Sequence, residues 1–172
     1  QGWIYTVIDR GTMAFEDALG RSGSALSYTD TSVNVNPEQN GIYLQKWRDS
    51  EFTARFANHG HIIKNVKVWV KTELTTEKDI EVIHYLLPYG LVSGNKRNNY
   101  PAAVDAAPKF VGIVPAGTSG WAEVTLELQD HDSAEFIIPS TWFGYNGGDL
   151  NVYPEFKFAN TEVGDKIYLD DY

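Results

Sequence analysis

Carboxylate side chains stand near both ends of this 172-residue chain. Glu16 follows Phe15 at the head of the expected first strand, and Asp170 and Asp171 end the alternating run that starts at Lys166. If the chain closes into a two-sheet sandwich, its first and last strands are neighbours. Carboxylate oxygens are the ligands that hard cations such as calcium prefer. The two ends therefore predict either a structural calcium site, which would also pin the termini together, or acids that merely stand at a strand end and at a solvated terminus.

Aromatic side chains form a second group with binding potential, because five Trp, ten Tyr and eight Phe are more rings than a core of this size needs. Flat ring faces stack on the apolar faces of sugars, and Asn, Gln, Asp or Arg side chains add directed hydrogen bonds. Two polar loops, residues 88–108 and 140–149, are longer or richer in rings than connectors need to be. The candidate ligand-binding residues on these loops are Trp142, Tyr145, Tyr89, Tyr100, Arg97 and Asn99.

Two further rings are expected on strands. In the run from Asn65 to Lys71, three valines alternate with Lys67, Trp69 and Lys71, so the Trp and both Lys share the face opposite the core. That face predicts either a solvated groove or packing under a loop, and lysines lining a groove would favour an acidic glycan. Tyr85 lies in a run that is apolar on both faces, which leaves core and groove open. The other three tryptophans, Trp3, Trp47 and Trp121, are expected to be structural.

An enzyme is the main alternative. His59 and His61 flank a single Gly, with Arg55 upstream, and such residues suit a polysaccharide lyase or a zinc site. The same segment fits a turn between two strands, and no carboxylate pair is singled out for glycoside hydrolysis. No catalytic residue is therefore assigned. A surface adhesion or structural sandwich, whose loop rings meet protein, is the third class.

Short alternating runs recur at intervals of roughly 8 to 12 residues, separated by Gly, Asn, Asp and Pro, and long helical periodicity is almost absent. This rhythm predicts an all-β, two-sheet antiparallel sandwich of the jelly-roll type. The expected strands are Trp3–Ile8, Ala25–Tyr28, Ile42–Trp47, Phe52–Phe56, Ile63–Leu74, Ile80–Leu87, Ala122–Leu128, Glu135–Ile138, Asn151–Ala159 and Lys166–Asp170.

The length, composition and net charge of the chain limit the other classes of protein that it could belong to. The chain is 42% hydrophobic and 22% charged, which is the composition of a globular protein, and its length suits a single domain over residues 1–172. A net charge of -9 argues against nucleic acid as a partner. The absence of Cys excludes disulfides and thiolate chemistry. No run of 18 apolar residues is present, so no membrane span is expected, and the start at Gln1 fits a mature or excised domain.

Three stretches give the chain a resemblance to a known group. Phe15-Glu16, the strand Asn40-Gly41-Ile42-Tyr43-Leu44 and the closing Tyr168-Leu169-Asp170-Asp171 resemble motifs of the β-jelly-roll, galactose-binding-like carbohydrate-binding modules of polysaccharide-degrading enzymes, with Val68-Trp69-Val70-Lys71 as a weaker match. The order and spacing suit these modules over nearly the whole chain. Residues 20–36 show no clean pattern of the group.

The resemblance implies a non-catalytic module that binds a polysaccharide or oligosaccharide and is tethered to a catalytic domain. It implies secretion or a cell-surface location. It also implies a structural calcium as the cofactor, held by Glu16, the backbone of Asn40 and Gly41, and Asp170 or Asp171. The identity of the polysaccharide stays open.

Overall fold

The structure is a computed structural model that describes residues 4–7, 11–21, 23–31, 41–45, 62–88, 108–129, 133–137 and 152–171. For residues 4–7, 41–45, 86–88 and 152–155 the description is of the backbone.

The described residues form strands and turns and contain no helix. The strands are β1 (Ile4–Val7), β2 (Gly11–Glu16), β3 (Ala25–Asp30), β4 (Gly41–Gln45), β5 (Ile62–Ile63), β6 (Asn65–Glu73), β7 (Ile80–Pro88), β8 (Lys109–Val114), β9 (Ala122–Gln129), β10 (Phe136–Ile137), β11 (Val152–Ala159) and β12 (Lys166–Asp170).

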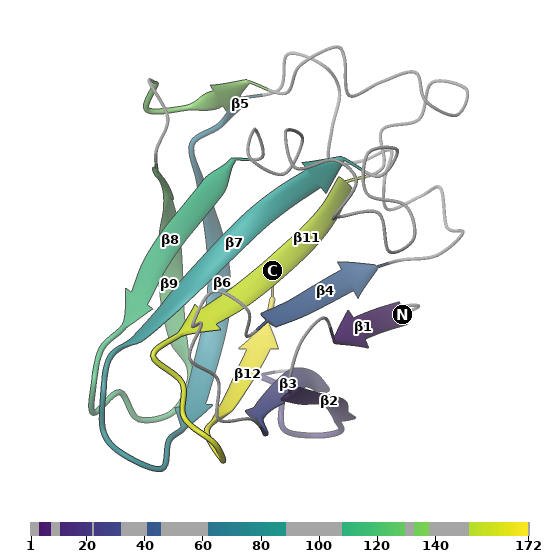
Figure 1. The fold of residues 1–172 in the computed structure, drawn as a ribbon, viewed down its shortest axis with the longest axis vertical. Coiled ribbons are helices and arrows are strands. Elements are labelled where there is room, and N and C mark those ends of the chain that lie inside the picture. Colours follow the sequence, from purple (N-terminus) through teal and green to yellow (C-terminus); the bar gives the residue numbers. More distant parts are fainter. Residues whose placement is uncertain are drawn as a thin grey trace.

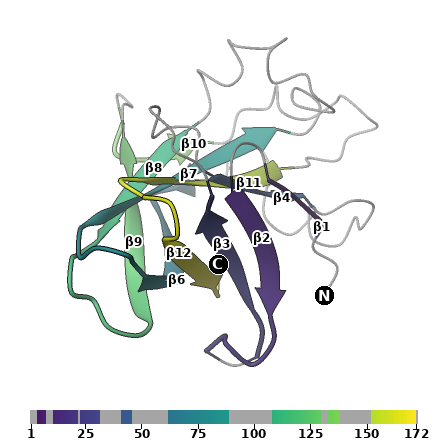
Figure 2. The same cartoon turned by 60° about the horizontal axis from the view of Figure 1, so that its bottom comes forward.

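Ten of these strands form one curled antiparallel sheet in the order β1-β4-β11-β7-β8-β9-β6-β12-β3-β2, and β5 and β10 form a separate ribbon. The sheet folds over on itself, so that β2, β3, β12, β6 and β9 make one layer and β8, β7, β11, β4 and β1 make the other (Figures 1 and 2). The layers join where β8 pairs with β9, from Lys109↔Gln129 to Val111↔Glu127. The predicted all-β sandwich is confirmed, with its two layers hydrogen-bonded to each other.

Alternation of side chains explains why these segments become strands that share one core. On β6, Val68 and Val70 are fully buried while Lys67 is exposed, as the sequence predicts. Each layer turns one set of alternate residues inward. The core cluster is made of Leu26, Tyr28, Val68, Val70, Ile80, Val82, Phe110, Val114, Val124, Leu126, Phe136, Phe156, Phe158, Ile167 and Leu169.

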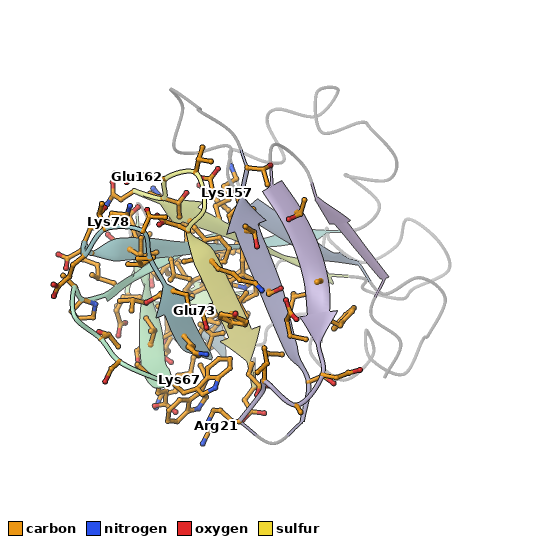
Figure 3. All side chains as sticks on the ribbon, turned by 90° about the horizontal axis from the view of Figure 1, so that it is seen from below. Arg21, Lys67, Glu73, Lys78, Lys157 and Glu162 are labelled. Carbon is orange, nitrogen blue, oxygen red and sulfur yellow. The ribbon has the colours of Figure 1, made fainter. Side chains whose placement is uncertain are left out.

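One buried carboxylate joins two turns at the end of the sandwich, the β6–β7 and β11–β12 connections. The side chain of Asp165 has no exposed surface and accepts hydrogen bonds from the backbone N–H and the hydroxyl of Thr75, both at 2.7 Å, and from the N–H of Glu162 at 2.7 Å. The ammonium of Lys78 lies 2.8 Å from the same carboxylate and 3.1 Å from Glu162, beside which it is seen in Figure 3. Burial acts to raise the pKa of Asp165, but the donors around it lower the pKa overall.

The structure corrects the predicted strand list at three places. Residues 11–16 and 109–114 form β2 and β8, which the sequence did not predict. Glu16 accordingly ends the second strand, whereas the sequence placed it at the head of the first. The expected strand Ile63–Leu74 is divided into β5 and β6, and the expected strand Phe52–Phe56 lies outside the described residues. Within the described part of the chain, no helix has the length and apolar character needed to cross a bilayer.

Candidate functional site

The two strand rings predicted to bind a ligand, Trp69 and Tyr85, lie on outer faces of different layers. Trp69 is the register partner of Glu123 on β9. Tyr85 pairs with Lys109 of β8, and Lys109 in turn pairs with Gln129 of β9. These two positions on β9 are about 20 Å apart at the usual rise per residue. We therefore treat two surfaces separately. The Trp69 face consists of Glu16, Arg21, Ser27, Lys67, Trp69, Lys71, Glu73, Trp121, Glu123, Lys166 and Tyr168, and the Tyr85 face consists of Ile83, Tyr85, Lys109, Val111 and Lys157.

On the Trp69 face the indole is covered by a cation of the chain itself. The guanidinium of Arg21 lies 3.6 Å from the centre of the Trp69 ring, and Figure 3 shows Arg21 at the lower edge of that view, near Lys67. Arg21 is held by its backbone N–H, which donates to Asp170 Oδ2 at 2.7 Å, and by its Nη1, which lies 2.6 Å from Asp171 Oδ2. This contact stabilises Trp69 as part of the fold and occupies a ring face that a sugar would need.

The lysines beside Trp69 also have partners within the chain. Lys67 Nζ donates to Glu123 at 2.9 Å, and Lys71 Nζ donates to Glu73 at 2.9 Å. The pKa of Glu73 is lowered, chiefly by the hydrogen bond from Lys71 and with a smaller contribution from Tyr168, against the opposing effect of burial. The positive charge of this face is therefore balanced by neighbouring carboxylates.

Tyr168 lies at the centre of this network although it points away from the core. Its hydroxyl donates to Glu73 at 2.9 Å, and the ammonium groups of Lys71 and Lys166 lie 4.8 and 5.1 Å from its ring centre. Trp121 approaches the ring edge-on at a centroid distance of 6.5 Å. Burial and the Glu73 carboxylate raise the pKa of Tyr168. With 2% of its surface exposed, Tyr168 is a second, outer packing centre of this layer.

Glu16 belongs to the same surface. Its Oε1 accepts hydrogen bonds from Lys166 Nζ at 2.7 Å and from the Ser27 hydroxyl at 3.0 Å. The hydrogen bonds from Lys166 and then Ser27 lower the pKa of Glu16, while burial opposes them weakly. The pKa of Lys166 is raised, mainly by Glu16. The pair is therefore charged on both sides at neutral pH.

The carboxylates predicted to hold calcium are brought to one region of the sheet. Glu16 is the register partner of Ala25, and Asp170 follows Leu169, whose partner is Leu26. Glu16 and Asp170 thus flank β3 at nearly the same level. Gly41 lies on β4, where it pairs with Lys157 of β11, and Asn40 lies outside the described residues. In the described part of the chain, no three His, Asp or Glu side chains are grouped as metal ligands.

The Tyr85 face has a different character. Ile83 and Lys157 are register partners that do not belong to the core cluster, yet their exposed fractions are 3% and 8%. The Lys157 ammonium lies 5.2 Å from the centre of the Tyr85 ring, and Figure 3 shows Lys157 on the side of the molecule opposite Arg21 and Lys67. Tyr85 itself is half-buried. A cation thus lies over this ring as well, but here it comes from the neighbouring strand of a shielded face.

Register aligns one position from each of four strands at the level of Tyr85. Tyr43 of β4 pairs with Glu155 of β11, Glu155 pairs with Tyr85 of β7, and Tyr85 pairs with Lys109 of β8. We call these four positions the Tyr85 row. Directly opposed positions of an antiparallel sheet belong to the same face. The row spans about 14 Å, three strand spacings.

The sequence missed several residues of both faces. Lys109, Lys157, Glu155 and Tyr43 were not among the predicted site residues, because their neighbours come from distant strands and only the register reveals them. Arg21 was missed because its contact with Trp69 joins the β2–β3 turn to a distant strand. The predicted loop residues Trp142, Tyr145, Tyr89, Tyr100, Arg97 and Asn99 lie outside the described residues. The same is true of His59, His61 and Arg55.

Solved structures share the architecture of this chain. A structure of the N-terminal carbohydrate-binding and glycoside hydrolase modules (CBM22-1 and GH10) of a Clostridium thermocellum endo-1,4-β-D-xylanase, complexed with xylohexaose, matches with a TM-score of 0.51 and 15% identity. That match covers 97% of this chain and 24% of the other. No protein-family model and no curated protein sequence matches the chain.

Two further structures match more weakly. They are a family 30 carbohydrate-binding module, with a TM-score of 0.45, 12% identity and coverage of 99% and 84%, and a Bacteroides vulgatus protein described as a glycoside hydrolase, with a TM-score of 0.42, 11% identity and coverage of 92% and 75%. The fold of this chain is the β-sandwich found in carbohydrate-binding modules, as the resemblance of its sequence motifs implies.

Proposed function

We propose that this chain is a non-catalytic carbohydrate-binding module that binds a polysaccharide along the Tyr85 row. The observation that carries the proposal is the alignment of Tyr43, Glu155, Tyr85 and Lys109 at successive cross-strand positions. A row of this kind combines rings with acidic and basic residues, the types that stack on sugar rings and hydrogen-bond their hydroxyls. The fold shared with a carbohydrate-binding structure supports the same function.

The geometry of the row suits a chain-like ligand. Its length of about 14 Å runs across the strands and is sufficient to contact more than one sugar ring. The Lys157 ammonium lies 5.2 Å from the centre of the Tyr85 ring, whereas the Arg21 guanidinium lies 3.6 Å from that of Trp69, so the Tyr85 ring is less closely covered by a cation of the chain. The loop residues Trp142 and Tyr145 stay candidates for contact with a ligand.

The first ligand to test is a β-1,4-linked xylan oligosaccharide, because the xylanase structure with the matching fold is described with xylohexaose. The Trp69 face is the weaker candidate, because Arg21 stacks on its Trp and its lysines are paired with Glu73 and Glu123. We further propose that the chain is secreted or displayed outside the cell and is joined to a polysaccharide-degrading enzyme. The chain spans 24% of the length of that xylanase structure.

Affinity electrophoresis of the purified chain through gels containing neutral or acidic polysaccharides tests this function. We expect retardation by at least one neutral polysaccharide, xylan first, with no shortening of the polymer over the same incubation. If only acidic polymers retard the chain, the binding site lies on a surface with more available cations than the Tyr85 row. Migration unchanged in every gel would contradict the proposed function, and depolymerisation would identify an enzyme.

A further inference from the structure

The negative charge of the carboxylates around β3 can be compensated either by a metal ion or by cationic side chains of the chain itself. Glu16, Asp170 and Asp171 come from the two ends of the chain, and the resemblance described above implies a calcium ion between them. Calcium takes six to eight oxygen ligands at about 2.3 to 2.6 Å. Whether the described residues fit such an ion depends on what already contacts the carboxylate oxygens.

Positively charged side chains and backbone N–H groups contact these oxygens. Lys166 Nζ lies 2.7 Å from Glu16 Oε1, which also accepts from Ser27. On the other side of β3, Asp170 Oδ2 accepts from the Arg21 N–H at 2.7 Å, and Asp170 Oδ1 accepts from the Asp171 N–H at 2.9 Å. Asp171 Oδ2 lies 2.6 Å from Arg21 Nη1. A calcium ion bound to Glu16 Oε1 or Asp170 Oδ2 would have to displace these donors.

Most of the negative charge of the cluster is also compensated without a metal. Lys166 and Arg21 contribute two positive charges against the three negative charges of Glu16, Asp170 and Asp171, so the residual charge of the cluster is small. Both cations are fixed by second contacts: Lys166 lies over the Tyr168 ring, and Arg21 stacks on Trp69. Each ring contact is made at the charged group, so a cation that is already positioned by a ring loses little further entropy on pairing. The described residues therefore do not fit the implied calcium site.

We infer that Lys166 and Arg21 perform the structural task that the resemblance assigns to calcium, and that this chain folds and keeps its two ends together without a bound metal ion. Lys166 links β12 to β2 through Glu16, and Arg21 links the β2–β3 hairpin to the carboxylates at the end of β12. Both contacts join residues that are 150 positions apart in the sequence. This inference concerns the stability of the fold and does not depend on sugar binding.

Thermal unfolding of the wild-type chain in excess EDTA and in calcium chloride tests the inference, with magnesium chloride of equal ionic strength as the control. Calcium is raised to about 10 mM, which is about 100 times the Kd of an extracellular protein site of about 0.1 mM. We expect the Tm to be the same in all three solutions. Calcium at about 100 times the Kd of a site would raise the Tm of a chain of this size by roughly 5 to 11 °C. A rise of that order with calcium, but not with magnesium, would overturn the inference.

Lys166→Met removes the ammonium and retains a long apolar side chain, and Lys166→Arg retains the charge as the matched control. We expect the Met variant to unfold at a lower temperature in EDTA than wild type, and the pKa of Glu16, followed by NMR, to rise toward its ordinary value. The Arg variant should keep the Glu16 pKa low. An unchanged Glu16 pKa in the Met variant would show that Lys166 does not balance this carboxylate. If the Met variant does not fold, the wild-type comparison with and without calcium still decides the question.

Discussion

The Trp69 face and the Tyr85 face lie on opposite layers of the same sandwich, and both place a cation over an aromatic ring. On the Trp69 face the lysines, Arg21 and the nearby acids are joined in contacts of 2.6 to 2.9 Å, such as Lys67 with Glu123 and Arg21 with Asp171. On the Tyr85 face a row of four residues crosses four strands, beside the shielded pair Ile83 and Lys157. Aromatic and basic residues alone therefore do not mark a binding surface.

The difference lies in what the neighbouring strands contribute. The outer residues of β6 face the acids of β9 and the Tyr and Lys residues of β12, so the potential hydrogen-bond partners of a ligand are already engaged. Such a surface stabilises the sandwich from the outside. Across the Tyr85 row the residue types alternate between ring, acid, ring and base, which suits a ligand with both apolar faces and hydroxyl groups.

The largest effect on binding is expected from Tyr85→Ala. Loss of a central stacking ring should weaken oligosaccharide binding by about 30-fold, equivalent to about 2 kcal/mol, as measured by isothermal titration calorimetry. Tyr85→Phe keeps the ring and should bind within a few-fold of wild type. Equal affinity of the Ala variant and wild type would remove the Tyr85 row from the site.

Trp69→Ala is the matched change on the other face. Because it removes the stack with Arg21 and a half-buried ring, we expect a loss of about 1 to 2 kcal/mol in the free energy of unfolding. Denaturant titration measures this loss, and oligosaccharide affinity should stay unchanged in the folded variant. A Trp69→Ala protein of normal stability that no longer binds sugar would reverse the roles of the two faces.

A smaller difference is expected between two lysines. Lys109 ends the Tyr85 row, so Lys109→Ala should weaken binding about threefold, equivalent to about 0.6 kcal/mol. Lys67, whose side chain is 58% exposed and paired with Glu123, serves as the control, and Lys67→Ala should leave the affinity unchanged. Calorimetry under identical salt conditions compares the two. Equal effects of both substitutions would indicate a general charge effect and not a row contact.

The smallest expected effect is a pH dependence confined to stability. The pKa values of Glu16 and Glu73 are lowered below 4.5, mainly by Lys166 and Lys71 respectively. The stability that these pairs contribute is therefore fully present above pH 4.5 and is lost as the pH falls through the lowered pKa values. The Tm should fall over that window by less in Lys166→Met than in wild type. An identical acid dependence in both proteins would contradict the assignment to Glu16.

The sequence predicts the architecture well where one face of a strand is clearly apolar. The alternation on β6, with Val68 and Val70 inside and Lys67 outside, can be read directly from the amino-acid sequence. β8 was missed because its run, Lys109 to Val114, contains Gly112 and adjoins a long polar stretch. At Gly112 an added Cβ would lie 2.7 Å from the Thr125 carbonyl oxygen, so the close approach of β8 and β9 accounts for the Gly that obscured the strand.

The site is less accessible to sequence reasoning than the fold. Trp69 and Tyr85 are separately recognisable as outer or ambiguous rings, but their separation onto two layers follows from the strand order. Arg21 lies in the segment without a recognisable pattern, and its stack on Trp69 joins residues 48 positions apart in the printed sequence. The Tyr85 row combines positions 43, 85, 109 and 155, which no local motif connects.

The most direct test of the division between the two faces is an NMR titration of the ¹⁵N-labelled chain with a xylan oligosaccharide, following the backbone amide signals of β6, β7, β8, β11 and β12. We predict that the largest shifts fall at residues 83–85, 109–111 and 153–157, around the Tyr85 row, with small shifts at 67–71 and 166–170. Shifts concentrated at 67–71 and 166–170, with the β7, β8 and β11 signals unmoved, would contradict this account and place the ligand on the Trp69 face.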